Sequence, residues 1–301
     1  MEQNKKVSII LPVYNGADSV SDSIDSVLNQ TYGNLELIIV NDCSTDGTDQ
    51  IIEKYAKQDA RIIIIHNVMN QKLPRSLNVG FQAATGEYLT WTSDDNIYRE
   101  SAIERMVYEL EYDSDAGMVY TDYTFVNELE NEVKTSVMVA SAPETLRLRN
   151  VVGACFLYRH DVADMTGIYD PEMFLAEDYD YWIRIWSNTK CIVLHEDLYI
   201  YRLQPKGLTA TRREAVRKQT GAVISKHFDF LYSTCNTYKE KIEFFDNLMN
   251  YTADDKKREE LKRMFKYMPS YKFYRPIKQA KGCILGNVSR IKKILGSDLN
   301  E

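Results

Sequence analysis

The chain has 301 residues, of which 44% are apolar and 27% are charged, and its formal net charge is −7. This globular composition excludes a mainly disordered or fibrous protein, and a chain of this length is expected to bury a sizeable core without cross-links. The five cysteines are odd in number and scattered without a CxxC pair, which argues against a zinc ribbon or a disulfide framework and favours a reducing compartment.

The first hundred residues alternate short apolar runs with segments of helical periodicity. Residues 7–11 are predicted to form a buried strand, and Val20, Ile24 and Val27 then repeat with the spacing of one helix face. The same alternation predicts further strands at 35–40, 61–65 and 88–91, and further helices around 51–56 and at 73–84. This order of elements predicts a parallel sheet with helices on both of its faces.

The pattern changes after residue 97. A helix is expected around 103–110, another is expected to begin near Glu177, and the chain has helical character beyond about Arg212. Short strands are expected at 118–121, 133–139, 151–158, 192–194 and 198–201. The second part of the chain is therefore predicted to lack the regular strand–helix alternation of the first.

Candidate ligand-binding residues, three of them acidic, stand where the first, second and fourth predicted strands end. They are Pro12, Val13, Tyr14 and Asn15 after the first strand, Asp42 after the second, and Asp94 and Asp95 after the fourth. In parallel sheets, ligands bind beyond the carboxyl ends of the strands. We therefore expect three carboxylates to share one rim of the sheet.

Seven short motifs follow one another along the chain. They are Ile10–Asn15, Ser26–Tyr32, Asp42–Thr48, Leu77–Gly80, Ala84–Leu89, Ser93–Asn96 and Glu177–Asp178. In this order and at this spacing they resemble the motifs of the family 2 glycosyltransferases. The segment Thr92–Tyr98 resembles the metal motif of the spore-coat polysaccharide branch of that family, and the whole resemblance covers roughly residues 5–205.

The resemblance implies the GT-A fold, an α/β architecture in which a Rossmann-like mixed sheet carries helices on both faces. The catalytic domain is expected over residues 1–215, with a nucleotide-sugar half at 1–97 and an acceptor half at 98–215. Residues 216–301 are expected to form a basic, helical C-terminal region outside it.

The resemblance also implies a metal-dependent, inverting enzyme that moves a sugar from a nucleotide-diphosphate donor, expected to be a UDP-sugar. The expected acceptor is a hydroxyl of a glycan or lipid-linked glycan in cell-surface polysaccharide synthesis. The alternative is a non-catalytic sugar-nucleotide or glycan-binding module of the same fold. No P-loop or Gly-rich loop follows the first strand, which argues against a nucleotidyltransferase, and the acidic body argues against nucleic acid as a partner.

Asp95 is the expected ligand of Mn²⁺ or Mg²⁺, because these ions prefer one or two carboxylates together with phosphate oxygens. The resemblance assigns donor contacts to Asp94 and to the segment Pro12, Val13, Tyr14 and Asn15. It assigns the nucleotide base to Asp42, although Asn41 stands where many members carry a second acid. The alternative for these acids is that they form turns and cap the helices that follow.

Positive charge near the diphosphate has several candidate sources. Arg75 precedes the third helix and either binds phosphate or is a solvated residue of the first turn. Family members often carry a His after the last short strand, whereas this chain has none there. Lys206, Arg212 or Arg213 are the candidates to supply charge in its place.

Asp178 is the expected catalytic base, because the resemblance gives this role to the second acid of Glu177–Asp178. Glu177 is expected to support it, Asp180 is the rival base, and Tyr179 and Trp182 are expected to line an acceptor site. A base that removes the proton of the attacking hydroxyl contributes about 10²–10⁴-fold in rate. The alternative is that acids in a first helical turn only complement the helix dipole.

The C-terminal part of the chain is basic. Residues 256–295 contain 13 Lys or Arg against two Glu, a net charge of +11. Between 278 and 295 apolar residues recur near helical spacing with cations between them, as in a helix that lies on a membrane surface. The alternative is a helix packed on the catalytic domain. The polar start of the chain and the lack of an 18-residue apolar run predict a cytoplasmic protein, with peripheral contact at the inner membrane face left open.

Overall fold

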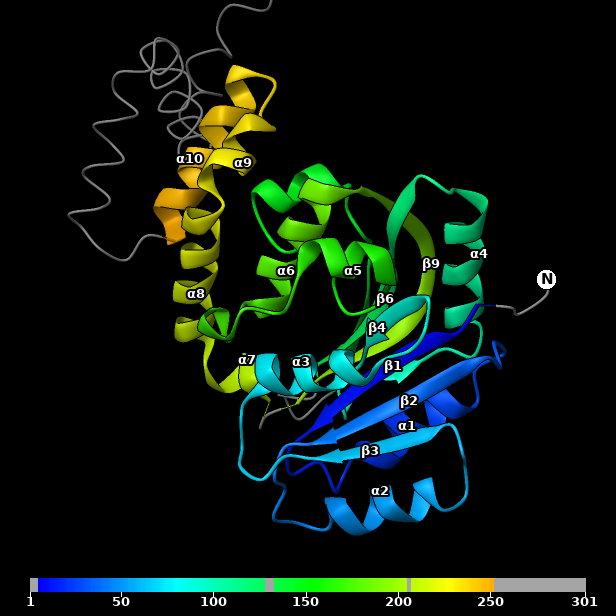
Figure 1. Cartoon of the computed structure of the whole chain (residues 1–301). Coiled ribbons are helices and arrows are strands. Elements are labelled where there is room, and N and C mark those ends of the chain that lie inside the picture. Colours follow the sequence, from blue (N-terminus) through cyan, green and yellow to red (C-terminus); the bar gives the residue numbers. More distant parts are fainter. Residues whose placement is uncertain (1–4, 128–132, 205–206, 252–301) are drawn as a thin grey trace, which may run out of the picture. The chain divides into compact units, whose positions relative to one another are not determined.

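A nine-stranded sheet organises the part of the chain that the computed structural model describes, which is residues 5–127, 133–204 and 207–251 (Figure 1). Four strands in the order β3-β2-β1-β4 run parallel. Their bounds are β1 Val7–Val13, β2 Leu35–Asn41, β3 Ile62–His66 and β4 Tyr88–Trp91. The parallel first half predicted from the sequence is therefore confirmed.

The sheet continues beyond β4 with strands of mixed direction. The order is β8 (Phe156–Arg159), β6 (Ala116–Asn127), β9 (Lys190–Leu203) and β5 (Ile97–Tyr98), with β7 (Lys134–Met138) beside β6. β8 is antiparallel to β4 and to β6, whereas β6 and β9 are parallel. The mixed sheet of the expected α/β fold class is therefore present.

Helices cover both faces of this sheet, as the alternation of the first hundred residues predicted (Figure 1). On one face α1 (Val20–Leu28), α2 (Thr48–Ala56) and α4 (Ala102–Tyr112) bury Ile24, Ile52 and Ile103 in one apolar cluster that also contains Ile9 of β1. On the other face lie α3 (Leu73–Ala83), α5 (His160–Thr166) and α6 (Glu177–Asn188). Burial of these apolar side chains stabilises the sheet by about 25 cal/mol for each Å² removed from water.

Several strand predictions are wrong in their extent. The strand predicted at 118–121 is the middle of β6, which runs from Ala116 to Asn127. Of the predicted strand 151–158 only the part from Phe156 onward belongs to a strand, β8, because Gly153 has φ +69°, a left-handed conformation outside the extended region of regular strands. The two short strands predicted at 192–194 and 198–201 are one strand, β9. Thr121 pairs with Leu194 and the next residue, Asp122, pairs with Asp197, so the register shifts at this point. The two polar residues at 195–196 form a bulge within β9 and do not end the strand.

Contacts divide the chain into two units, Met1–Leu231 and Tyr232–Glu301. The first unit holds the sheet, the short helix α7 (Leu208–Thr211) and α8 (Arg213–Lys226), and α9 (Phe228–Ser233) spans the division. The described part of the second unit contains α10 (Tyr238–Tyr251), where Phe244 and Phe245 contact the ring of Tyr232. The helical C-terminal extension is thus present, whereas a functional boundary at residue 215 stays a prediction.

None of the helices within the described ranges is both long and apolar enough to cross a membrane. The segment 278–295, for which membrane contact was one of two alternatives, lies outside the described residues.

Candidate active site

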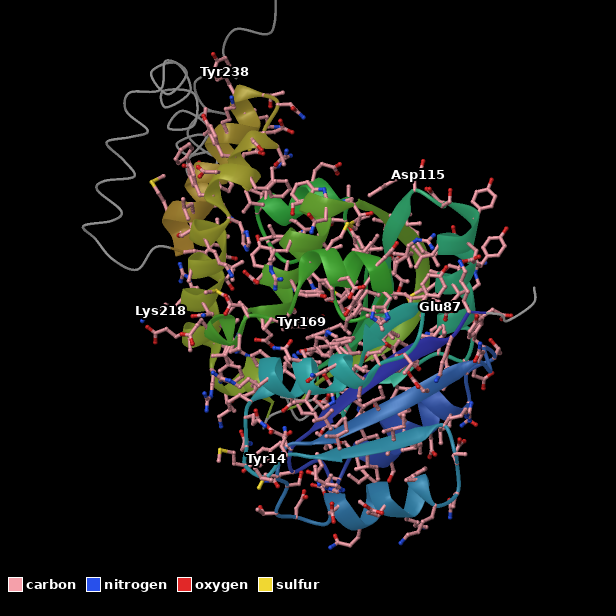
Figure 2. All side chains as sticks on the ribbon, viewed as in Figure 1. Tyr14, Glu87, Asp115, Tyr169, Lys218 and Tyr238 are labelled. Carbon is pink, nitrogen blue, oxygen red and sulfur yellow. The ribbon has the colours of Figure 1, made fainter. Side chains whose placement is uncertain are left out.

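A cavity of about 1050 Å³ opens at the rim where the parallel strands end. Figure 2 places Tyr14 at this rim, and Asp115 and Glu87 at the opposite end of the sheet. Ten of the predicted site residues line the cavity, namely Pro12, Val13, Tyr14, Asn15, Asp42, Asp94, Asp95, Glu177, Asp178 and Tyr179. The fold therefore brings side chains from both halves of the first unit to one space.

The loops after β1 and β2 hold each other in place. The side-chain oxygen of Asn15 accepts a hydrogen bond from the backbone N–H of Thr45 at 2.8 Å, and its own N–H donates to Ser44 Oγ at 3.0 Å. Gly16 N–H donates to Thr48 Oγ1 at 2.9 Å. A larger residue is sterically excluded at position 16, because a Cβ there would collide with Asp94 Oδ2. Asn15 is therefore a structural link between two loops of the rim.

Asp42 is only 4% exposed, and its carboxylate orders the segment that follows β3. It accepts hydrogen bonds from Asn67 Nδ2 at 2.8 Å and from the backbone N–H groups of Gln71 at 2.8 Å and Lys72 at 3.0 Å. A carboxylate has about four acceptor positions. Contacts within the described residues therefore leave Asp42 about one position with which to accept a hydrogen bond from a ligand.

The loop after β4 is fixed from two sides. Ser23 Oγ of α1 donates to the carbonyl of Ser93 at 2.8 Å, and the backbone N–H of Arg202 at the end of β9 donates to Asn96 Oδ1 at 2.9 Å. Between these anchors stand Asp94 and Asp95. Burial and the negative charge of Asp95 raise the pKa of Asp94 to about 7.

This pair of acids fits a divalent cation. Two adjacent carboxylates repel each other, and a cation between them would remove the repulsion that raises the pKa of Asp94. Within the described part of the chain no three Asp, Glu, His or Cys side chains converge as a complete metal cage. Mg²⁺ and Mn²⁺ suit such a partial site, because they take one or two carboxylates and complete their coordination with phosphate and water oxygens.

Asp178 lies in the first turn of α6 and lines the same cavity as the acids after β4. Its Oδ1 accepts a hydrogen bond from the N–H of Tyr179 at 2.7 Å, and its Oδ2 accepts one from Asn150 Nδ2 at 2.8 Å. Burial raises the pKa of Asp178, and these two donors oppose the rise. A carboxylate with a raised pKa that lines a cavity is suited to accept a proton.

Glu177 stabilises the backbone just before this turn through a hydrogen bond. It is 5% exposed, and burial together with the charge of Asp178 raises its pKa. Its Oε2 accepts a hydrogen bond from the N–H of Leu175 at 2.7 Å, and Leu175 has φ +80°. A bulky side chain rarely adopts this left-handed conformation. Glu177 therefore holds a strained residue at the cavity wall.

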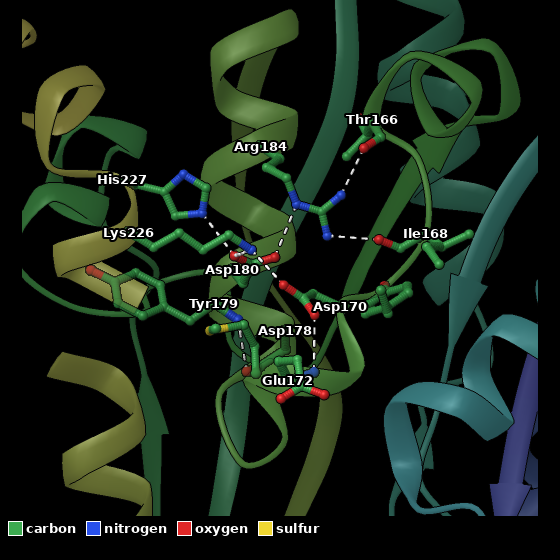
Figure 3. A network of polar contacts seen from close by, with 12 residues as sticks. Thr166, Ile168, Asp170, Glu172, Asp178, Tyr179, Asp180, Arg184, Lys226 and His227 are labelled. Carbon is green, nitrogen blue, oxygen red and sulfur yellow. Dashed lines mark hydrogen bonds and ion pairs between the residues drawn. The ribbon is translucent and has the colours of Figure 1, made fainter. Parts of the chain in front are cut away.

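Asp180, the rival base, is fully buried, is not among the cavity-lining residues and faces α8 (Figure 3). It accepts contacts from Arg184 Nε at 2.9 Å, Lys226 Nζ at 2.8 Å and His227 Nε2 at 2.8 Å. Burial opposes its ionisation, but hydrogen bonds from His227 and Lys226 and the charge of Arg184 outweigh burial and lower the pKa of Asp180 to about 2. Asp180 therefore joins α6 to the end of α8.

Replacing Asp180 with asparagine is expected to destabilise the fold by about 1.5–3 kcal/mol at pH 7, because Arg184 and Lys226 lose their hydrogen bonds to a buried charged partner. The folded-state pKa lies below the unfolded value, so the stabilisation from ionisation is present above about pH 4 and is lost as the pH falls towards 2. The free energy of unfolding in urea, measured between about pH 7 and pH 2, shows this loss. The more exposed partner of Lys226, Asp170, is the control: Asp170→Asn is expected to cost about 1 kcal/mol or less. Equal losses for both variants would contradict the assigned role of Asp180.

Two predicted site residues lie elsewhere. Arg75 lines a separate cavity of about 680 Å³ with His160 and Tyr169, so the structure does not bring it to the rim of the main cavity. Trp182 has no exposed surface and packs on Phe156 with ring centroids 4.4 Å apart. It therefore belongs to the core beneath α6 and not to a cavity wall.

Four basic side chains line the main cavity instead, namely Lys72, Arg149, Arg202 and Arg212. Arg212 is one of the three candidates expected to replace the missing His, whereas Lys206 lies outside the described residues and Arg213 is not among the lining residues. Arg202 also pairs with Asp22 at 3.4 Å. Positive charge is thus available at the site from residues before α3, before β8 and around the end of β9.

Comparisons with known proteins identify the family. Residues 8–165 match the model of Glycosyl transferase family 2. The chain is 30% identical to the uncharacterized glycosyltransferase EpsJ of Bacillus subtilis, over 67% of this chain and 62% of EpsJ. It is 27% identical to the putative teichuronic acid biosynthesis glycosyltransferase TuaG of the same organism, over 70% of this chain and 84% of TuaG.

Solved structures show the same fold. TarS of S. aureus in complex with UDP-GlcNAc matches with a TM-score of 0.58 and 17% identity, over 82% of this chain and 80% of that chain. The mannosyltransferase PcManGT of Pyrobaculum calidifontis, in complex with GDP-Man and Mn²⁺, matches with a TM-score of 0.60 and 15% identity, over 95% and 82% of the two chains. The expected GT-A fold is therefore confirmed.

Proposed function

Because the chain belongs to glycosyl transferase family 2, we propose that it transfers a sugar from a nucleotide-diphosphate donor to a hydroxyl of a glycan acceptor in cell-surface polysaccharide synthesis. One observation carries the proposal: an acid after β4, Asp95, and an acid in the first turn of α6, Asp178, line the same cavity. Transfer needs both a place for the diphosphate and a base for the acceptor.

The donor is proposed to lie along the loops after β1, β2 and β4. Tyr14 is half exposed at this rim and offers an aromatic surface, and Asp42 has about one acceptor position left for the imide N–H of uracil. A UDP-sugar is therefore the proposed donor, in line with the UDP-GlcNAc complex of the structurally similar TarS. Basic side chains such as Arg212 would offset the charge of the diphosphate.

Asp95, with Asp94 beside it, is proposed to hold Mn²⁺ or Mg²⁺. A divalent cation bound there neutralises charge on the nucleoside diphosphate as it leaves. The burial of Asp94 and its closeness to Asp95 support this placement. The Mn²⁺ complex of PcManGT concerns a protein of the same fold and is consistent with it.

Asp178 is proposed to take the proton of the acceptor hydroxyl. The hydroxyl oxygen forms a bond to the anomeric carbon while the bond from that carbon to the diphosphate oxygen breaks, and the sugar inverts. The proton passes to Asp178, and the nucleoside diphosphate leaves. The position of Asp178 in the wall of the cavity that the donor loops also line supports this role.

Release of nucleoside diphosphate from a panel of UDP- and GDP-sugars, with Mn²⁺ and a mixture of glycan acceptors, tests the proposal. Acceptor-stimulated release from at least one donor is the expected result. Donor binding with no release under any condition would favour the alternative, a sugar-nucleotide-binding module of the same fold.

A further inference from the structure

The segment before β8 is tied to the first turn of α6 at two points. Asn150 Nδ2 donates a hydrogen bond to Asp178 Oδ2 at 2.8 Å. Tyr179 Oη, whose side chain is buried, donates to the carbonyl oxygen of Leu146 at 2.5 Å. Two consecutive residues of one helical turn therefore hold both ends of segment 146–150.

The orientation of the Asn150 amide is set by its surroundings. Its oxygen accepts a hydrogen bond from the N–H of Val152 at 3.3 Å, which turns its NH₂ group towards Asp178. The opposite orientation would place an amide oxygen against a carboxylate oxygen and a donor against a donor. Gly153 completes the turn at φ +69°, where a Cβ would collide with the ring of Tyr123.

Both oxygens of the Asp178 carboxylate therefore have a donor in a defined place. The N–H of Tyr179 contacts Oδ1 and fixes the carboxylate relative to its own helix, whereas Asn150 contacts Oδ2 from a different element. Hydrogen bonds to a carboxylate favour its ionised form. They also limit its rotation, which decides where its remaining lone pairs point.

We propose that Asn150 is a positioning residue: its amide holds the Asp178 carboxylate ionised and turned into the cavity. This inference rests on the proposed function, in which Asp178 is the base. Asn150 exchanges no proton itself, and it acts only through Asp178. Its side chain is exposed at the cavity wall, so no part of the core depends on it.

Kinetics of Asn150→Ala are the first test. The variant is expected to lower kcat by about 10- to 100-fold, as for the loss of one hydrogen bond to a charged group, with the KM for the donor unchanged. Because the lost donor favoured ionisation, the acidic limb of the pH–rate profile is expected to move to higher pH. Asn150→Gln, which keeps an amide donor, is expected to restore part of kcat.

The matched control is Asn188→Ala. Asn188 is also an exposed asparagine, and it lies at the other end of α6, where its amide donates to Thr166 Oγ1 at 3.4 Å. The kcat and the pH profile of Asn188→Ala are expected to equal those of the unaltered protein. An Asn150→Ala profile identical to that of Asn188→Ala would overturn the proposal.

A second readout does not depend on turnover. The ¹³C carboxyl resonance of Asp178, identified by its loss in Asp178→Asn, can be titrated in the unaltered protein and in Asn150→Ala. A higher midpoint in Asn150→Ala is expected, and an unchanged midpoint would overturn the role of Asn150. A protein that turns over no donor would defeat the proposed function, while this titration would still decide the role of Asn150.

Discussion

Replacing Asp178 with asparagine is expected to lower sugar transfer by about 10²–10⁴-fold, because the reaction loses its base. Donor affinity is expected to stay the same, since the proposed donor contacts lie on the loops after β1, β2 and β4. Asparagine has nearly the same shape, and its oxygen can still accept the hydrogen bond from the N–H of Tyr179. Single-turnover rates and a donor dissociation constant, measured on the same preparation, separate the two effects.

The matched control for this variant is Asp164→Asn. Asp164 is an exposed carboxylate on α5, the helix packed against α6, and it is not among the residues that line the main cavity. This variant is expected to transfer sugar at the normal rate. Near-normal turnover by Asp178→Asn would show that Asp178 is not the base.

Replacing Asp95 with alanine has the second largest expected effect. The metal-dependent part of donor binding is expected to weaken by at least about 100-fold. Removing a residue that only hydrogen-bonds a metal ligand already lowers metal affinity by about 10–100-fold, and removing the ligand itself is expected to cost at least as much. Equilibrium dialysis with labelled UDP, in the presence of Mn²⁺ and in the presence of a chelator, measures this part separately.

Asp115→Ala removes the same charge at the opposite end of the sheet (Figure 2) and is the control for Asp95→Ala. It is expected to bind UDP and Mn²⁺ as the unaltered protein does. If Asp95→Ala kept the full gain in UDP affinity on addition of Mn²⁺, the metal would have to be held elsewhere.

The first half of the fold could be predicted from the sequence because its signals are local. Val20, Ile24 and Val27 repeat at helical spacing and are all buried on the face of α1 that meets the sheet. Parallel strands end at one rim, so the position of Asp42 and Asp95 after their strands was sufficient to bring them to one cavity.

The second half depends on contacts between distant segments, which periodicity does not contain. Asp178 and Asp180 are two positions apart and so face different sides of α6, but only the packing of α8 decides which one is buried. Trp182 follows Asp178 by one helical turn, yet the neighbouring strand β8 places Phe156 against it. Asn150 and Ser23 act through single hydrogen bonds from a loop and from a helix, and no sequence pattern marks them.

The most direct test of the account is a calorimetric titration of UDP-sugars into the unaltered protein, with Mn²⁺ and then with a chelator. We predict saturable binding of one donor per chain that requires the cation, because the cavity pairs a partial carboxylate site with room for a diphosphate. Absence of binding by any nucleotide sugar in the presence of Mn²⁺ would contradict the assignment of this cavity.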